Sequence, residues 1–126
     1  HPDTEGGLYL EAADLAKIGR LMLDDGRWNG RQLVPASFIR AAVARHVTGL
    51  PGGFDYGYQW WITRRGDRDI WAGRGFGGQF LVIIPSLDIV GVANAWNVFP
   101  FDAARDVRPR NLQNALIDAL MALPPR

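Results

Sequence analysis

The sequence contains no cysteine, and it has one lysine and two serines among its 126 residues. The missing cysteine excludes disulfides, thiolate nucleophiles and zinc–thiolate sites, but it leaves the redox compartment open. An excess of charge of one sign is also lacking, because 14 Lys and Arg face 13 Asp and Glu for a net charge of +1. This balance lacks the basic footprint of a nucleic-acid-binding protein, so we expect no nucleic-acid partner.

Long hydrophobic runs are absent as well. The longest uninterrupted aliphatic and aromatic stretch, residues 80–84, is far shorter than the ~20 residues that a membrane-spanning helix needs. The first residues do not form a basic and apolar leader peptide. The remaining composition is 48% hydrophobic and 21% charged, which is typical of a globular protein. We therefore expect one soluble segment over residues 1–126, with one core and no membrane span.

Helical patterns dominate the first part of the sequence, residues 1–55. Apolar residues at helical spacing predict a helix over 11–25. The dipeptide Asn29-Gly30 predicts a two-residue hairpin turn, because both residue types tolerate positive φ. A second helix is expected to begin at Pro35, and residues 48–57 are interpreted as a loop.

The next part, residues 56–98, is typical of antiparallel strands joined by short turns. Segments rich in aromatic and β-branched residues predict strands over 58–63, 69–72, 79–84 and 89–95. The glycine cluster 73–78 is expected to form one of the turns. A closing helix over 109–123 is expected to cover the sheet through an apolar stripe of Leu112, Leu116, Ala119, Leu120 and Leu123. Helices followed by short-connected strands predict the α+β class, an antiparallel sheet with packing helices.

The glycine cluster Gly73-Arg74-Gly75-Phe76-Gly77-Gly78 matches the G-x-G-x-x-G spacing of dinucleotide-binding loops. That motif needs a following helix whose N-terminus holds the pyrophosphate, whereas a strand is predicted here. We therefore interpret the cluster as a glycine-rich β-connection. A backbone with so few side chains also lets another group approach closely.

The sequence offers two candidate serine nucleophiles, Ser37 and Ser86, which are its only serines. Arg40 follows Ser37 at the Ser-x-x-Lys spacing, but a guanidinium stays protonated and cannot accept the serine proton. The only lysine, Lys17, is expected to be solvated on the surface of the first helix. No Ser–Lys pair is therefore present in this chain.

The sequence also gives little support for a metal site or an acid–base pair. His1 and His46 lie far apart in sequence without a helical carboxylate partner, so we expect no metal and no other cofactor. The carboxylate pairs Asp24-Asp25 and Asp67/Asp69 fall at a helix end and in a hairpin turn, where solvated residues are the simpler interpretation. Four tryptophans are expected in the core or in a pocket wall: Trp60, Trp61, Trp71 and Trp96.

Several segments occur together in a distinctive order: 6–10, 13–19, 26–30 with Val34-Pro35, 56–61, 75–79, and Pro85 with 88–90. Together they resemble the C-terminal part of serine β-lactamase-related hydrolases. The family includes class C β-lactamases, D-alanyl-D-alanine carboxypeptidases, esterases and, most similar, the 6-aminohexanoate-dimer hydrolase type. The resemblance implies a β-lactamase/transpeptidase-like fold and hydrolysis of a small-molecule amide or ester through an acyl-enzyme.

Family members carry Ser-x-x-Lys and a Tyr-x-Asn or Ser-x-Asn motif upstream of the Gly-Gly-Leu stretch. Because this chain has neither motif, the resemblance implies that both lie on a missing N-terminal part of the same protein. That N-terminal part would be the macromolecular partner of this segment, which should be inactive alone.

The family's third motif, Lys-Thr-Gly or His-Thr-Gly, corresponds to Gly73-Arg74-Gly75. The resemblance implies that the Phe76 backbone N–H belongs to the oxyanion hole and that Gly75 and Gly77 keep the strand approachable. Arg74 departs from the motif but could attract an anionic group. The other candidate substrate-binding residues are Tyr58, Trp60 and Gln79, with core packing or strand support as the alternative for each.

Two other hypotheses stay open. The chain could be a noncatalytic binding or scaffold module that reuses the fold. A separate N-terminal fragment could instead associate with it to rebuild a site, because a truncated sheet exposes an apolar face. An upstream reading frame that encodes Ser-x-x-Lys would favour the enzyme.

Overall fold

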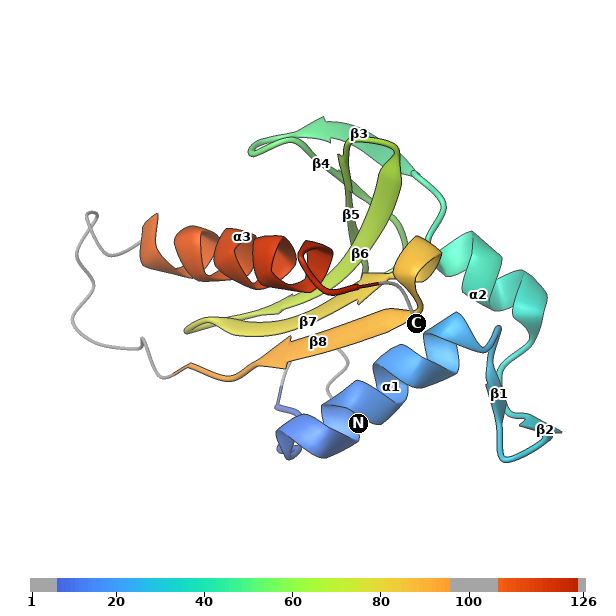
Figure 1. Ribbon diagram of the computed structural model, residues 1–126. Coiled ribbons are helices and arrows are strands. Elements are labelled where there is room, and N and C mark those ends of the chain that lie inside the picture. Colours follow the sequence, from blue (N-terminus) through green and yellow to red (C-terminus); the bar gives the residue numbers. More distant parts are fainter. Residues whose placement is uncertain (1–6, 96–106, 125–126) are drawn as a thin grey trace.

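The computed structural model describes residues 7–95 and 107–124. Its centre is a six-stranded antiparallel sheet in the order β3-β4-β5-β6-β7-β8 (Figure 1). The strands are β3 (Val47–Leu50), β4 (Phe54–Tyr56), β5 (Trp61–Arg65), β6 (Arg68–Gly75), β7 (Gln79–Ile84) and β8 (Ile89–Ala93). A separate two-stranded hairpin consists of β1 (Arg27–Trp28) and β2 (Arg31–Gln32). The helices are α1 (Ala12–Leu23), α2 (Ala36–Ala42) and α3 (Val107–Met121), with a 3-10 turn at Pro85–Leu87.

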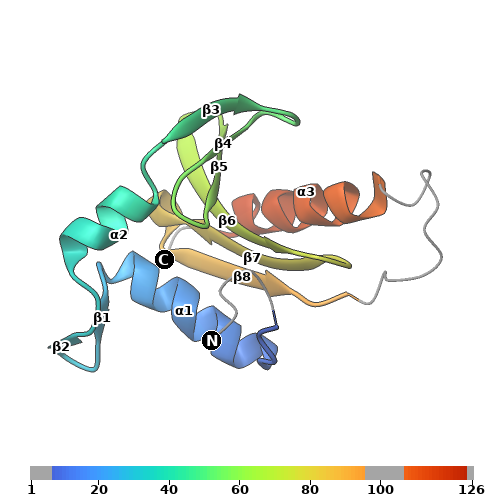
Figure 2. The same ribbon diagram turned by 180° about the vertical axis from the view of Figure 1, so that it is seen from behind.

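Each face of the sheet buries its own set of apolar side chains, because successive strand residues point to opposite faces. On one face, Val82 and Ile84 of β7 pack with Ile117 and Leu120 of α3. On the other face, the intervening residues Leu81 and Ile83 pack with side chains of α1 and α2. Figure 2 shows these two helices beside the sheet. The α+β class and the antiparallel sheet with packing helices are therefore confirmed.

Both long helices approach β8 closely. A Cβ at Gly19 of α1 would lie 2.5 Å from Val90 Cγ1, and a Cβ at Gly91 of β8 would lie 2.5 Å from Leu120 Cδ1. The absence of a side chain at these positions lets α1 and α3 pack against opposite faces of the same strand. In the described residues, no helix combines the length and apolar character needed to cross a membrane.

The predicted loop 48–57 is wrong, because it contains the paired strands β3 and β4. Both strands are short, and Gly49 at φ 73° falls within their irregular register. The Asp55 carboxylate accepts a hydrogen bond from the Gly49 N–H at 3.0 Å. Such strands are stabilised mainly by their neighbours in the sheet, so the local sequence pattern does not show them.

The strand predicted over 58–63 begins three residues later, at Trp61. Gln59 has φ 65°, which an extended strand cannot contain, and the Gly57 N–H donates to the Trp60 carbonyl at 2.9 Å. The predicted turn 73–78 is also too long, because β6 continues to Gly75 and only residues 76–78 form the turn.

The closing helix is confirmed within α3, but its predicted apolar stripe is partly wrong. The sheet-facing residues are Gln113, Ile117 and Leu120, which are all buried, whereas Ala119 and Leu123 are exposed. The strand predicted over 89–95 ends at Ala93. The expected role of Trp96 in the core lies outside the described residues.

Candidate functional site

The β6–β7 hairpin holds the segment singled out by its glycines. β5 pairs with β6 only up to Ala72, whereas β7 pairs with β6 as far as Gly75 opposite Gln79. The last three residues of β6 therefore belong to the β6–β7 ladder but not to the β5–β6 ladder. Residues 76–78 then form the turn, with Gly77 at φ 75° and Gly78 at φ 94°.

Phe76 is the first residue of this turn, and it is 67% exposed. Phe76 therefore lies at the surface, at the end of the β6–β7 ladder. The neighbouring Gly75 is exposed as well. A ligand could approach the main chain here without displacing core side chains.

Close packing explains the glycine at position 75. A Cβ added to Gly75 would lie 2.9 Å from Cβ and 3.5 Å from Cγ of Gln79, its cross-strand partner. At Gly73 the nearest atom would be Leu81 Cβ at 3.6 Å, which is ordinary contact. The side chain of Gln79 thus lies against the bare backbone of Gly75, and its Nε2 donates to the Ala95 carbonyl.

Arg74 lies on the other face of the sheet from its neighbour Gly75, because strand residues alternate. Its guanidinium carbon lies 4.7 Å from the ring centroid of Trp61 and 5.0 Å from that of Phe54. These distances are typical of cation–π contacts. The structure therefore separates this cation from the face on which Gly75 and Gln79 meet.

The remaining candidate binding residues contact the α2 side of the molecule. The Tyr58 ring stacks on His46 with a centroid distance of 4.2 Å, and its backbone N–H donates to Ala42 O at 2.9 Å. Trp60 packs against the core cluster that contains Ile83. The contacts of both side chains thus differ from those of the hairpin residues.

The two serines do not supply a nucleophile at the hairpin. Ser86 follows the far end of β7, and five strand steps of about 3.3 Å place that end roughly 17 Å from Gln79. Its Oγ accepts a hydrogen bond from Arg68 at 3.2 Å. Ser37 is exposed on α2, and Lys17 pairs with Asp14 at 2.6 Å. Among the described residues, no group of three His, Cys, Asp or Glu could hold a metal ion.

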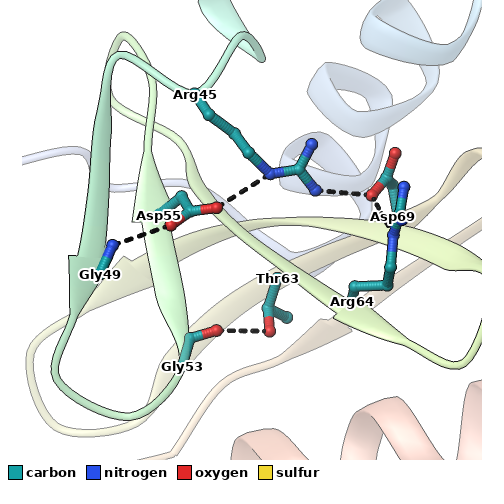
Figure 3. Close-up of polar contacts among 7 residues, drawn as sticks. All are labelled: Arg45, Gly49, Gly53, Asp55, Thr63, Arg64 and Asp69. Atoms are coloured by element: carbon teal, nitrogen blue, oxygen red, sulfur yellow. Dashed lines mark hydrogen bonds and ion pairs between the residues drawn. The ribbon is translucent and has the colours of Figure 1, made fainter.

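Sequence reasoning missed a network of charges on the α2 side of the sheet. The Arg45 guanidinium lies between two carboxylates, 2.9 Å from Asp55 and 2.7 Å from Asp69 (Figure 3). Arg64 also contacts Asp69 at 3.0 Å, and its hydrogen bond, together with that of Arg45, lowers the pKa of Asp69. The interpretation of Asp69 as a solvated turn residue is therefore wrong, since this residue lies in β6.

No spacing in the sequence indicates that network, because its contacting residues are 5 to 24 positions apart and lie on different elements. It connects β4 and β6 to the chain just after α2. Asp24 lies at the C-cap of α1, as expected, and it pairs with Arg20 across one helical turn, which lowers its pKa.

Comparison with known proteins gives a consistent picture. No protein family model matches the chain. A 6-aminohexanoate-dimer hydrolase of Paenarthrobacter ureafaciens is 33% identical over 97 residues, which cover 69% of this chain and 24% of that enzyme. A Bacillus anthracis structure, provisionally assigned as a 6-aminohexanoate-dimer hydrolase, has a TM-score of 0.62 and 28% identity, covering 90% of this chain and 30% of that one.

A penicillin-binding protein homologue of Caulobacter crescentus has a TM-score of 0.51 and 21% identity, covering 80% of this chain and 30% of its own. This likeness concerns the fold alone. Together, these findings define an α+β protein with the fold of the β-lactamases and penicillin-binding proteins. Within that class, the chain is a relative of the serine β-lactamase-related hydrolases, which confirms the resemblance of its sequence to their C-terminal segment. It spans about a quarter of the length of the curated relative.

Proposed function

We propose that the chain is the C-terminal part of a serine hydrolase that cleaves an amide or ester bond through an acyl-enzyme. In this proposal the end of the β6–β7 hairpin forms one wall of the active site. The observation that carries it is the exposure of the residues Gly75 and Phe76, at the end of a ladder that neighbouring β5 does not follow. The relationship to 6-aminohexanoate-dimer hydrolases supports the reaction class.

The nucleophile and its base are assigned to sequence outside this chain. The two serines lie on α2 and beyond the far end of β7, and the only lysine is in α1. A serine from the rest of the protein attacks the substrate carbonyl, and the base takes the hydroxyl proton. The same proton then goes to the departing amine or alcohol, and water hydrolyses the acyl-serine.

The contribution of this chain is electrostatic. As the carbonyl carbon becomes tetrahedral, its oxygen becomes an oxyanion that backbone N–H donors stabilise. We assign one of these donors to Phe76. Gly75 and Gly77 on either side add no side chain that would shield the N–H from a substrate.

We assign Arg74 a structural role instead of the anion-attracting role that the sequence suggested. Its guanidinium lies over Trp61 and Phe54, on the face opposite to Gly75. We assign it to supporting the strand, because a cation that lies over two rings is already engaged by the protein.

The test compares Phe76→Pro with Phe76→Ala in the longer polypeptide that contains this segment and a Ser-x-x-Lys motif. Proline removes the N–H, whereas alanine removes the exposed ring and keeps the N–H. With p-nitrophenyl acetate and the 6-aminohexanoate dimer as substrates, we expect kcat to fall about 10²- to 10³-fold for proline and far less for alanine. Equal losses in two folded variants would refute the oxyanion role.

A noncatalytic binding or scaffold module is the second candidate, and the lack of a serine–base pair within the chain favours it. A fluorophosphonate probe separates the two functions. The enzyme hypothesis expects covalent labelling of a serine in the longer polypeptide and none in the 126-residue chain. A longer polypeptide without a reactive serine would favour the binding module.

A further inference from the structure

Gln79 connects the tip of the β6–β7 hairpin to the segment that follows β8. We infer that Gln79 is a positioning residue, whose side chain holds the Phe76 backbone N–H in place for the reaction. This inference rests on the proposed function. It differs from a substrate-binding role for Gln79, because the side-chain amide is used within the protein.

The first observation is where Gln79 lies in the hairpin. It is the first residue of β7 and the cross-strand partner of Gly75, which directly precedes Phe76. Its Cβ and Cγ lie so close to Gly75 that an added Cβ there would be 2.9 Å and 3.5 Å away. The Gln79 side chain thus packs against the residue that directly precedes the Phe76 nitrogen.

The second observation is what holds the hairpin tip from the side. The β7–β8 ladder extends to Phe80 opposite Ala93, one residue short of Gln79. Beyond that point, the Gln79 Nε2 donates to the carbonyl of Ala95, two residues after the end of β8. A side-chain hydrogen bond thus continues the connection between the two strands where backbone pairing has ended.

The third observation is the conformational freedom of the backbone at residues 75–78. Three of the four residues from 75 to 78 are glycine, and two of them have positive φ. Glycine has the widest conformational freedom of any residue, so local backbone preference does not hold the turn in one shape. A bond from outside the turn adds a restraint to the packing around the buried Gly77 and Gly78, and Gln79 provides one.

Positioning matters because an oxyanion donor works only where the charge develops. Misplacement of a catalytic group by about 1 Å can cost on the order of 10²-fold in rate. Loss of the Gln79–Ala95 hydrogen bond should therefore lower kcat by about 10-fold or more, while KM changes little, because an oxyanion donor acts mainly in the transition state.

The experiment uses Gln79→Met and Gln79→Glu. Methionine keeps the length and the contact with Gly75 but cannot donate, whereas glutamate donates to Ala95 only when protonated. The matched control is Gln32→Met, because the Gln32 Nε2 also donates to backbone carbonyls, those of Asp25 at 2.7 Å and Val34 at 2.6 Å, in the β1–β2 hairpin.

Amide hydrogen exchange at residues 75–78 is measured in the 126-residue chain, and kcat and KM are measured in the longer polypeptide. We expect Gln79→Met to speed exchange at these amides and to lower kcat. Gln79→Glu should recover toward wild type as the pH falls, after normalisation to the wild-type pH profile. The Gln32→Met control should leave both measurements at the β6–β7 hairpin unchanged.

Unchanged exchange at residues 75–78 in a folded Gln79→Met variant would overturn the inference, as would a loss confined to KM. The two proposals can fail separately. If exchange responds to Gln79→Met but kcat tolerates Phe76→Pro, Gln79 still holds the hairpin and the oxyanion assignment is wrong. If Phe76→Pro abolishes activity but Gln79→Met changes neither exchange nor kcat, the positioning role is wrong and the proposed function stands.

Discussion

The turns of the β1–β2 and β6–β7 hairpins are held in place by different contacts. Each has positive-φ glycine in its turn and a glutamine side chain that donates to backbone carbonyl oxygen. In the first hairpin, Gln32 bonds to residues two and seven positions away, and the turn residues are Asn29 and Gly30. In the second, Gln79 bonds to a carbonyl 16 residues away, beyond the end of the neighbouring strand β8.

This difference explains why one hairpin was predicted accurately and the other was not. Asn29 and Gly30, at φ 48° and 77°, make a turn that the dipeptide itself specifies. The β6–β7 turn depends on the close contact of Gly75 with Gln79 and on pairing within a six-stranded sheet. Local chemistry positions the first turn, and tertiary contacts position the second.

The largest loss of stability is expected from a substitution at the base of the β1–β2 hairpin. Gly26 has φ 80°, and a Cβ there would lie 2.1 Å from the Val34 carbonyl oxygen. Gly26→Ala combines backbone strain with steric overlap, and we expect a loss of about 3 kcal/mol in the free energy of unfolding. Gly30→Ala is the control, because φ is 77° but nothing lies within 4 Å. Denaturant titration should show a loss of about 1 kcal/mol for Gly30→Ala. Equal losses in the two variants would show that backbone strain, and not steric overlap with Val34, causes the destabilisation.

An intermediate effect is expected on β6 of the second hairpin. Gly75→Ala places a Cβ 2.9 Å from Gln79 Cβ, an atom close to the backbone that cannot move easily. We expect a loss of about 1–3 kcal/mol. Gly73→Ala meets only ordinary contact at 3.6 Å and should lie within about 1 kcal/mol of wild type. The same loss at both positions, measured by thermal and chemical unfolding, would contradict a specific role for the Gly75–Gln79 contact.

The smallest expected effect concerns acid stability. Hydrogen bonds from Arg64 and Arg45 lower the pKa of Asp69, which lies on β6, below its unfolded value of about 3.9. Because the folded-state pKa is depressed, this contribution is complete above the unfolded pKa and is lost as the pH falls through the folded pKa. The pair is partly exposed, so we expect less than about 1 kcal/mol.

The NMR titration of Asp69 and the acid unfolding of Asp69→Asn test this. The variant should unfold with a weaker pH dependence below about pH 4. An unshifted Asp69 titration, or an unaltered acid transition in Asp69→Asn, would show that the charge network of Arg45, Asp55, Arg64 and Asp69 contributes nothing to stability.

The sequence predicted most of the regular elements, for physical reasons that act locally. The apolar spacing of α1, the Asn29-Gly30 turn and the β-branched run of β7 each favour one conformation within a few residues. It missed β3 and β4, because short strands around Gly49 are stabilised by their neighbours. It also missed Ile117 as a core residue of α3, since the helix orientation on the sheet selects which apolar side chains are buried.

For the candidate site, the sequence by itself determined the glycines at 73–78, the lack of a serine–lysine pair and the resemblance to a hydrolase family. These properties follow from residue identity alone. Only the tertiary structure decided that Arg74 faces away from Gly75, that Gln79 meets Ala95, and that Tyr58 and Trp60 contact the α2 side. The physical reason is that strand register and alternation assign every side chain to a face, and register is set by pairing between segments distant in the chain.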